Sequence, residues 1–513
     1  MVSLISRGRD GMNPMPPILG HLQRRTYEGN RWTKQNKIKV NHGKDALHMI
    51  WDFSIAMDDQ YRLEGVWDSQ YVKRLGFANQ VSHTRHEAVP TRDRTRFTVQ
   101  GHDAPERIPA GWPRQRKPES RVMEYEGKTL TMLYGDTHTH SWTSDGADPA
   151  DYYYHFARDF AGLDYFALSD HDFTVSYTPG LEALISFLPE QFTEKDFICF
   201  QAFEFSSQHK GHRVVVFERG YKPTFSMVVP PKNISNKTGQ LYRFLHRFGG
   251  DSNSRVLVTS HNMFSIGNDF AEYDEGLEPL YDVTSLHMVA EKSFEEIATV
   301  QQATGNLLGF QLFKLIGNIN KLNPSKSIAE KWFMSWRQAL ADGLPLGAYG
   351  GSDTHAANAV GYVASGLWVE GKSPKAIFDA MFARRSLGLD SQLRSGDMWN
   401  TSPLVRNRVR TPDMLRADVR FFLSGHFMGS RVKLDSAPVV RVVAANLDPH
   451  DPVRAVVFIR DGVEVHTEFG AEGGRSEFEW TDTGFSPGRH YYYVRVEFQS
   501  GNTAFPSPVF VNY

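Results

Sequence analysis

Short apolar runs and longer amphipathic stretches alternate along the middle of this chain, between residues 126 and 400. The runs are rich in branched and aromatic side chains, which favours buried strands. The stretches between them place apolar residues three or four positions apart, as in a helix that packs on a core. The strand candidates are residues 130–134, 165–168, 197–203, 213–217, 255–259, 283–286 and 346–349, and the helix candidates include 240–248, 293–303, 328–341 and 374–384.

The first two runs show the order strand, helix, strand most clearly. Asp148 and Pro149 stand as an N-cap and a first helical residue, and Gly162 ends the helical stretch before the run 165–168. Such a unit implies parallel strands. Its repetition predicts an α/β fold, either a closed barrel or an open doubly wound sheet.

The two flanks differ from this middle part, so three regions are predicted. Residues 1–125 are rich in Arg, Asn, Gly and Pro, and we expect an N-terminal extension that wraps the barrel. Residues 126–414 form the α/β part. Residues 415–513 lose the helical period and read as a small C-terminal β domain, sandwich-like in type.

Composition narrows the functional classes only slightly. The net charge is −2, which gives no indication of nucleic acid as a partner. No stretch has the ~20 apolar residues of a membrane span, and the N-terminus lacks a secretory pattern, so a cytoplasmic protein is expected. The single cysteine, Cys199, lies in an apolar run and is expected in the core, which excludes disulfides and thiolate metal sites.

Histidine and carboxylate side chains follow the apolar runs at their ends. Because the carboxyl ends of parallel strands open on one face, residues far apart in the chain are expected to converge there. Imidazole and carboxylate ligands suit Zn, Mn or Fe, and in His138-Thr-His140 both rings lie on one side of an extended chain. The residues placed in this way are His138, His140, Asp145, His171, Glu204, His261, Asp353 and His355.

These motifs resemble the PHP superfamily, named for polymerase and histidinol phosphatase domains. The segments are Asp136 to Gly146, Leu168 to Asp172, Phe203-Glu204 with Gly211-His212, Ser260-His261 and Gly351 to His355. Within that superfamily the chain resembles the branch called domain of unknown function 3604. The resemblance implies a distorted barrel of seven β/α units.

The resemblance also implies how two or three divalent ions would be held. His138, His140 and Asp353 would hold one ion, and Glu204 would bridge it to a second ion completed by His212 and His261. Asp145, His171 and His355 would hold a third. His209 is an alternative to His212 because it lies three residues away.

A metal cluster of this kind predicts a hydrolase that uses a metal-bridging hydroxide. The first expectation is a phosphoesterase acting on a small phosphorylated molecule, and the alternatives are an acyl-bond hydrolase or a metal-stabilised binding module. Asp170, Asp172 and His287 are the candidates for acid–base catalysis, although Asp172 could instead orient His171. Arg158, Arg213 and Arg385 could bind phosphate, but their spacing singles out none of them.

The C-terminal region is expected to serve packing or dimerisation, and the chain could form a homo-oligomer. A carbohydrate-binding role is the alternative, with Trp480 and Tyr491, Tyr492 and Tyr493 as aromatic platforms.

Overall fold

The computed structural model describes most of the chain from residue 121 onward and several backbone strands before it. The described ranges are the strands between residues 2 and 87, then 121–141, 143–144, 146, 150–172, 187–207, 211–219, 228–229, 233–234, 238–249, 255–261, 268–286, 289–291, 335–355, 357–391, 416–470 and 476–512. The predicted site residues Asp145 and His287, the alternative ligand His209 and the predicted helix at 293–303 lie outside these ranges.

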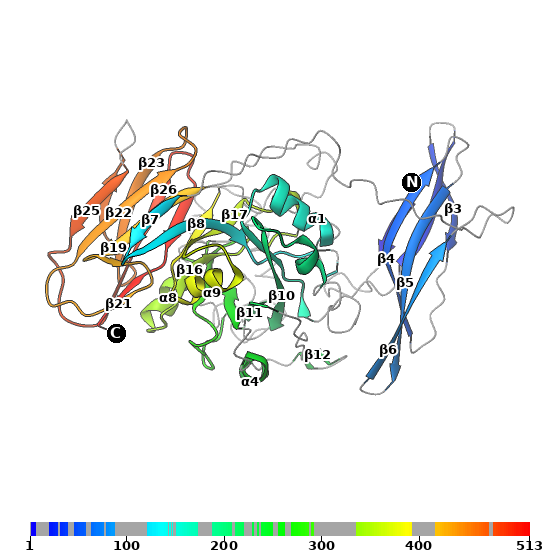
Figure 1. Ribbon diagram of the computed structural model, residues 1–513, viewed down its shortest axis with the longest axis horizontal. Coiled ribbons are helices and arrows are strands. Elements are labelled where there is room, and N and C mark those ends of the chain that lie inside the picture. Colours follow the sequence, from blue (N-terminus) through cyan, green and yellow to red (C-terminus); the bar gives the residue numbers. More distant parts are fainter. Residues whose placement is uncertain are drawn as a thin grey trace, which may run out of the picture. The chain divides into compact units, whose positions relative to one another are not determined.

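The chain divides into two compact units, residues 1–112 with 174–184 and residues 113–173 with 185–513. The first unit contains two antiparallel three-stranded sheets (Figure 1). Sequence patterning did not predict these strands. They are β1 (Val2–Ser6), β2 (Gly20–Glu28) and β3 (Arg31–Ile38), and β4 (Ala46–Met57), β5 (Leu63–Leu75) and β6 (Ala78–Glu87).

The second unit is organised around one large mixed sheet. Its first part has the strand order β16-β15-β14-β11-β10-β9-β8-β17-β18. Strands β8, β9, β10, β14, β15, β16 and β18 point the same way, while β11 and β17 run against them. The bounds are β7 (Val122–Tyr125), β8 (Lys128–Asp136), β9 (Tyr165–Leu168), β10 (Ile198–Ser207), β11 (Gly211–Phe217), β14 (Val256–His261), β15 (Leu280–Thr284), β16 (Gly347–Gly350), β17 (Val363–Val369) and β18 (Ser386–Asp390).

The predicted α/β class is confirmed, whereas a barrel of seven β/α units is not. Only residues 208–210 separate β10 from β11, and so short a link cannot cross over to a parallel strand. The helices with both ends described are also few: α1 (Ala150–His155) with the π-helix η1 (Phe156–Phe160), α4 (Thr238–Gly249), α8 (Trp336–Ala341), the 3₁₀ turn η2 (Ala357–Ala359) and α9 (Pro374–Phe382).

The segments that follow β8 and β16 lie side by side at one rim of the sheet. Asp353 N donates to His138 O at 2.8 Å, and His140 N donates to Thr354 O at 2.8 Å. Strands at opposite ends of the parallel set therefore meet where the predicted ligands lie. This contact brings residues more than two hundred positions apart into one site.

Helix α9 shows how local sequence signals and burial act together. The Ser373 side chain accepts from Ala376 N as an N-cap, and Pro374 occupies the first turn. Ile377, Phe378 and Met381 are fully buried in the core beneath the sheet. Burial of each stabilises the fold by about 1.5–3 kcal/mol.

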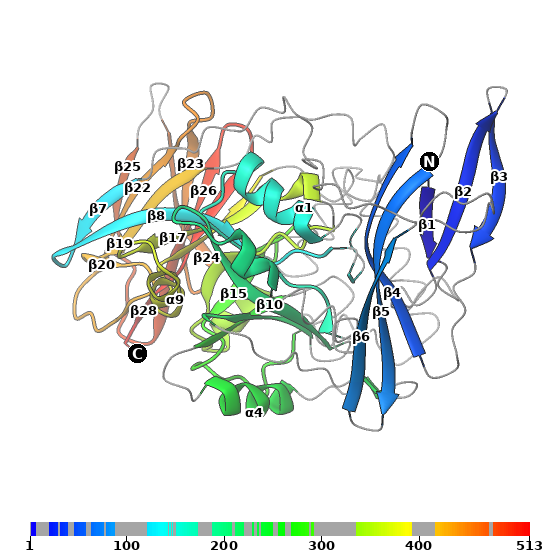
Figure 2. The same ribbon diagram turned by 45° about the vertical axis from the view of Figure 1, so that its right-hand side comes forward.

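The large sheet continues into the C-terminal strands through β18, which pairs with β27 (Thr503–Pro506). Figures 1 and 2 show these strands beside β7 and α9. The remaining strands are β19 (Ala417–Leu423), β20 (His426–Phe427), β21 (Arg431–Val432), β22 (Val439–Asn446), β23 (Val453–Arg460), β24 (Val463–Phe469), β25 (Glu477–Thr481), β26 (His490–Phe498) and β28 (Val509–Val511). Among the described residues, no helix is both long and apolar enough to cross a membrane.

The aromatic residues considered for carbohydrate binding do not form an exposed platform. Tyr491, Tyr492 and Tyr493 are all buried, and Tyr493 packs against Trp336 with ring centroids 4.7 Å apart. Trp480 stacks on His466 at 5.2 Å. These contacts favour the packing role.

Candidate metal centre

Every predicted metal ligand within the described residues lies at the same rim of the sheet. His138 and His140 follow β8, His171 follows β9, Glu204 lies in β10, His261 ends β14, and Asp353 and His355 follow β16. His212 belongs to the antiparallel strand β11, whose first residues lie at the rim where the parallel strands end. Their ligand atoms form several groups in which all atoms lie within 4.8 Å of one another.

The innermost group consists of His138, His140 and Asp353, with Glu204 beside it. Asp353 Oδ1 lies 3.5 Å from His138 Nε2 and 3.0 Å from His140 Nε2. Glu204 Oε1 lies 3.3 Å from His138 Nε2, and Oε2 lies 3.5 Å from His140 Nε2. These side chains are almost completely buried.

The spacing of these atoms fits ligands of a common ion. Nitrogen and oxygen ligands 2.0–2.2 Å from one metal are about 3.0–3.5 Å from each other. Among the described residues, His138 Nε2, His261 Nε2 and Glu204 Oε2 are buried and face other ligand atoms at 2.8–3.3 Å without hydrogen-bond geometry. Buried polar atoms usually have a partner, so an ion would supply what these atoms lack.

A second group brings His171, Glu204 and His212 together. Nδ1 of His171 lies 2.8 Å from Glu204 Oε2, and Nδ1 of His212 lies 2.9 Å from Glu204 Oε1. The resemblance had implied that His261 would complete this group. His261 lies opposite His212 across β11 and β14, and it also lies with His138 and Asp282, with its Nε2 3.0 Å from Asp353 Oδ2.

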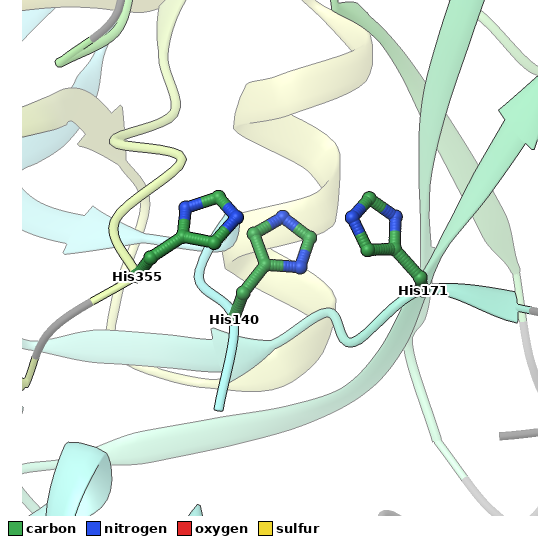
Figure 3. A group of neighbouring side chains, drawn as sticks. All are labelled: His140, His171 and His355. Carbon is green, nitrogen blue, oxygen red and sulfur yellow. The ribbon is translucent and has the colours of Figure 1, made fainter. Parts of the chain in front are cut away.

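The third group is formed by the rings of His140, His171 and His355, which face one another in Figure 3. The His140 ring centroid lies 4.4 Å from that of His171 and 4.6 Å from that of His355. His140 and His171 therefore each belong to two groups. The described ligands make one continuous cluster.

Asp282, in β15, was missed by sequence reasoning. Its Oδ2 lies 3.0 Å from His138 Nδ1, so the opposite ring nitrogen faces Glu204 and Asp353. A carboxylate that receives the second N–H of a ligating histidine fixes the tautomer and orientation of the ring. The available signal was a lone carboxylate inside an apolar run, between Tyr281 and Val283.

Burial and charge act against each other at the centre. Burial alone would lower the pKa of His138, but Asp353, Glu204 and Asp282 outweigh it and raise that pKa well above its usual value. Burial would raise the pKa of Glu204, yet the surrounding histidines hold it well below its usual range. Burial, together with the neighbouring His171, lowers the pKa of His140 to about 4.

Of the proposed acid–base residues, Asp170 and Asp172 are described. Asp170 Oδ1 accepts from Ser141 N at 2.7 Å and Ser144 Oγ at 2.6 Å, and Oδ2 accepts from Ser141 Oγ at 2.8 Å and from Thr143 Oγ1. These bonds favour a structural role, holding the loop after His140.

Asp172 accepts from Ser206 N at 3.0 Å, while Ser206 Oγ lies 2.6 Å from His171 Nδ1. Asp172 is thus linked to His171 through Ser206.

Arg213 points away from the cluster into the protein. It pairs with Glu278 at 2.8 Å, and both side chains are completely buried. Arg158 pairs with Asp159 and Glu194. Both guanidinium groups therefore have carboxylate counter-charges within the protein and need no phosphate ligand to balance them.

A family model described as "Protein of unknown function (DUF3604)" matches residues 181–308. The predicted resemblance to this family is confirmed over that stretch, which contains Glu204, His212, His261 and Asp282. No curated protein matches the sequence.

Two solved structures show a distant likeness. PsfC from Pseudomonas syringae PB-5123 has 15% identity and a TM-score of 0.32, and the match covers 54% of this chain and 96% of that chain. A two-domain protein from Bacteroides vulgatus ATCC 8482, containing a predicted PHP-like metal-dependent phosphoesterase, has 13% identity and a TM-score of 0.31, covering 74% of this chain and 94% of that chain. Scores this low support no conclusion about the present chain.

Proposed function

We propose, from the premise that residues 181–308 match the DUF3604 family, that this chain is a metal-dependent hydrolase. The observation that carries the proposal is the convergence of buried imidazole nitrogens and carboxylate oxygens at one rim, where His138 Nε2, His261 Nε2 and Glu204 Oε2 face other described ligand atoms without hydrogen-bond geometry. As part of the same proposal, the α/β part is a distorted PHP-type barrel.

The proposed ligands are His138, His140, His171, Glu204, His212, His261, Asp353 and His355, together with Asp145. Two or three ions of Zn, Mn or Fe suit this donor set. Such ions lower the pKa of a coordinated water and neutralise charge on substrate oxygens. The cluster therefore suits a phosphoester of a small molecule, whose transition state carries charge on several oxygens.

The chain's own residues would position the ligands and move protons. Asp282 holds the His138 ring, and the Asp172–Ser206 contact holds that of His171. Since Asp170 is engaged by the loop, Asp172 and His287 are the better candidates for proton transfer. Comparing His287→Ala and Asp172→Asn over a pH profile would assign this role.

The proposal is tested by metal analysis and by hydrolysis with Zn, Mn and Fe supplied separately. His138→Ala and Asp353→Ala should lose bound metal and abolish hydrolysis, because both side chains belong to the innermost group. Asp435→Ala, an exposed substitution, serves as the control. Unchanged metal content in His138→Ala would overturn the assignment.

A pair of chromogenic substrates separates the predicted activities. Cleavage of an aryl phosphate, with no cleavage of the matching acyl ester, would support the phosphoesterase. The reverse would favour the acyl hydrolase, and metal binding without turnover of a broader substrate panel would favour the binding module.

A further inference from the structure

A polar groove lies at the opposite end of strand β8 from the metal cluster. It has a volume of about 630 Å³ and is lined by the β7–β8 turn, the end of α9 and residues 426–433. Strand β8 begins next to this groove at Lys128 and ends beside the cluster at Asp136. At ~3.3 Å per residue, this strand separates the two places by roughly 25–30 Å.

Positive charge gathers around the groove. Arg385, His426, Arg431 and Lys433 line it, and Glu126 is the one acidic residue among the lining residues of this groove. Arg431 already contacts Glu275. The charge left for a ligand therefore comes from Arg385 and Lys433, with His426 beside them.

Arg385 is the most important cation of this groove. The side chain is partly buried, and this burial lowers the pKa of its guanidinium. Its Nε donates to Trp368 O at 3.1 Å. The charges of Glu370 and Asp379 act on Arg385 from a distance, but these carboxylates form their ion pairs with Lys128 and Arg255. A desolvated charge is costly unless it is paired, and an anion in the groove would supply the counter-charge.

A glycine holds the other cations next to Arg385. Gly429 has φ +86°, and a Cβ there would lie 2.2 Å from Ala383 O. Only glycine allows the segment 426–433 to pack this closely on the end of α9. Lys433 and His426 are exposed, and neither has an ion-pair partner among the described residues.

We propose that this groove is a binding site for a small molecule bearing a compact oxyanion, a phosphate or a carboxylate. Arg385 offers a planar set of donors and Lys433 a mobile point charge, a combination that suits such groups. The volume falls within the range of small-molecule pockets. The site is separate from the metal centre and does not depend on the proposed hydrolysis.

Position-resolved chemical labelling of the full chain tests the proposal. Arginines are modified with phenylglyoxal and lysines by acetylation, with and without inorganic phosphate, and the modified peptides are quantified. Phosphate should slow labelling of Arg385 and Lys433, while the exposed controls Arg441 and Lys375 stay unchanged. Equal labelling with and without phosphate, and also with and without succinate, would overturn the proposal.

A variant series gives an independent readout. Lys433→Gln and Arg385→Gln should each weaken protection of the other cation by about tenfold, since each removes a charge-assisted contact. Lys433 is exposed, so its substitution leaves the fold intact. His138→Ala should leave protection at the groove unchanged, whereas loss of protection in that variant would assign the anion to the metal centre and overturn the site.

Phosphate and succinate distinguish the two chemical sources. Protection by phosphate alone identifies a phosphorylated ligand, and protection by succinate alone identifies a carboxylate.

Discussion

At the scale of single residues, the proposed metal centre depends on side chains that orient the candidate ligands as much as on those ligands themselves. His138 faces the carboxylates because Asp282 holds its other ring nitrogen at 3.0 Å. Sequence patterning found His138 by its place after a strand, but Asp282 lies within one. Its importance comes from a contact across 144 positions, which no local pattern records.

Replacing Asp282 with Asn should weaken metal binding by about 10–100-fold, because the amide no longer fixes the His138 ring as a carboxylate does. Affinity is measured by competition with a chromophoric chelator. Asp435→Asn is the matched control, since Asp435 is exposed. Equal affinity in Asp282→Asn and the unmodified chain would remove Asp282 from the centre.

Metal affinity should rise with pH across the neutral range. Asp353, Glu204 and Asp282 overcome the effect of burial and raise the pKa of His138, so binding must displace a proton from it. Calorimetry in buffers of different ionisation enthalpy measures this release, which should shrink in His138→Gln. An affinity independent of pH would contradict the expectation.

The stability of the metal-free protein, unlike its metal affinity, should fall as the pH rises. The raised pKa of His138 means that its ion pairs contribute stability fully below the usual value of 6.5. That contribution is lost as the pH rises through the folded-state pKa. Chemical unfolding of the chelator-treated protein at several pH values checks the sign.

At the scale of elements, the rim combines parallel strands with an antiparallel one. β11 runs against its neighbours, yet its first residues lie at the same rim, and this places His212 opposite Ser206 and His261. The sequence indicated strands correctly at most positions. It did not indicate that β10 and β11 form an antiparallel hairpin. The all-parallel barrel predicted from the sequence is therefore not confirmed.

Strand β11 is also joined to the segment just before β15 by the Arg213–Glu278 pair, with both side chains completely buried. Glu278→Gln should destabilise the fold by about 3–5 kcal/mol, because it leaves a buried guanidinium unpaired. Denaturant titration measures this loss. The exposed pair Lys128–Glu370 is the comparison, where Glu370→Gln should cost less than about 1 kcal/mol.

At the scale of the whole molecule, the α/β part and the C-terminal strands share a core. Tyr281, Trp336 and Leu346 pack in one cluster with Tyr493 and Phe505. The sheet is continuous across the same junction, since β18 pairs with β27. Described residues from both sides of the predicted boundary at residue 415 therefore pack in one core.

A chain that ends at residue 414 should consequently fail to fold cooperatively, although it retains every proposed metal ligand. It would expose the apolar side of this cluster and leave β18 without its partner. Thermal unfolding and solubility check the expectation, with the full chain as reference. A soluble, metal-binding truncation would show instead that the C-terminal region is an independent domain.

The sequence by itself determined the α/β class, most strand positions and the types of side chain proposed as metal ligands, because strand and helix periods and residues after apolar runs are local features. Tertiary structure decided which histidines share a carboxylate, that Asp282 joins them and that Arg213 serves an internal ion pair. It also set the reversed strands and the shared core. These features depend on contacts between segments far apart in the chain, and free energy from such contacts leaves no periodic trace in the sequence.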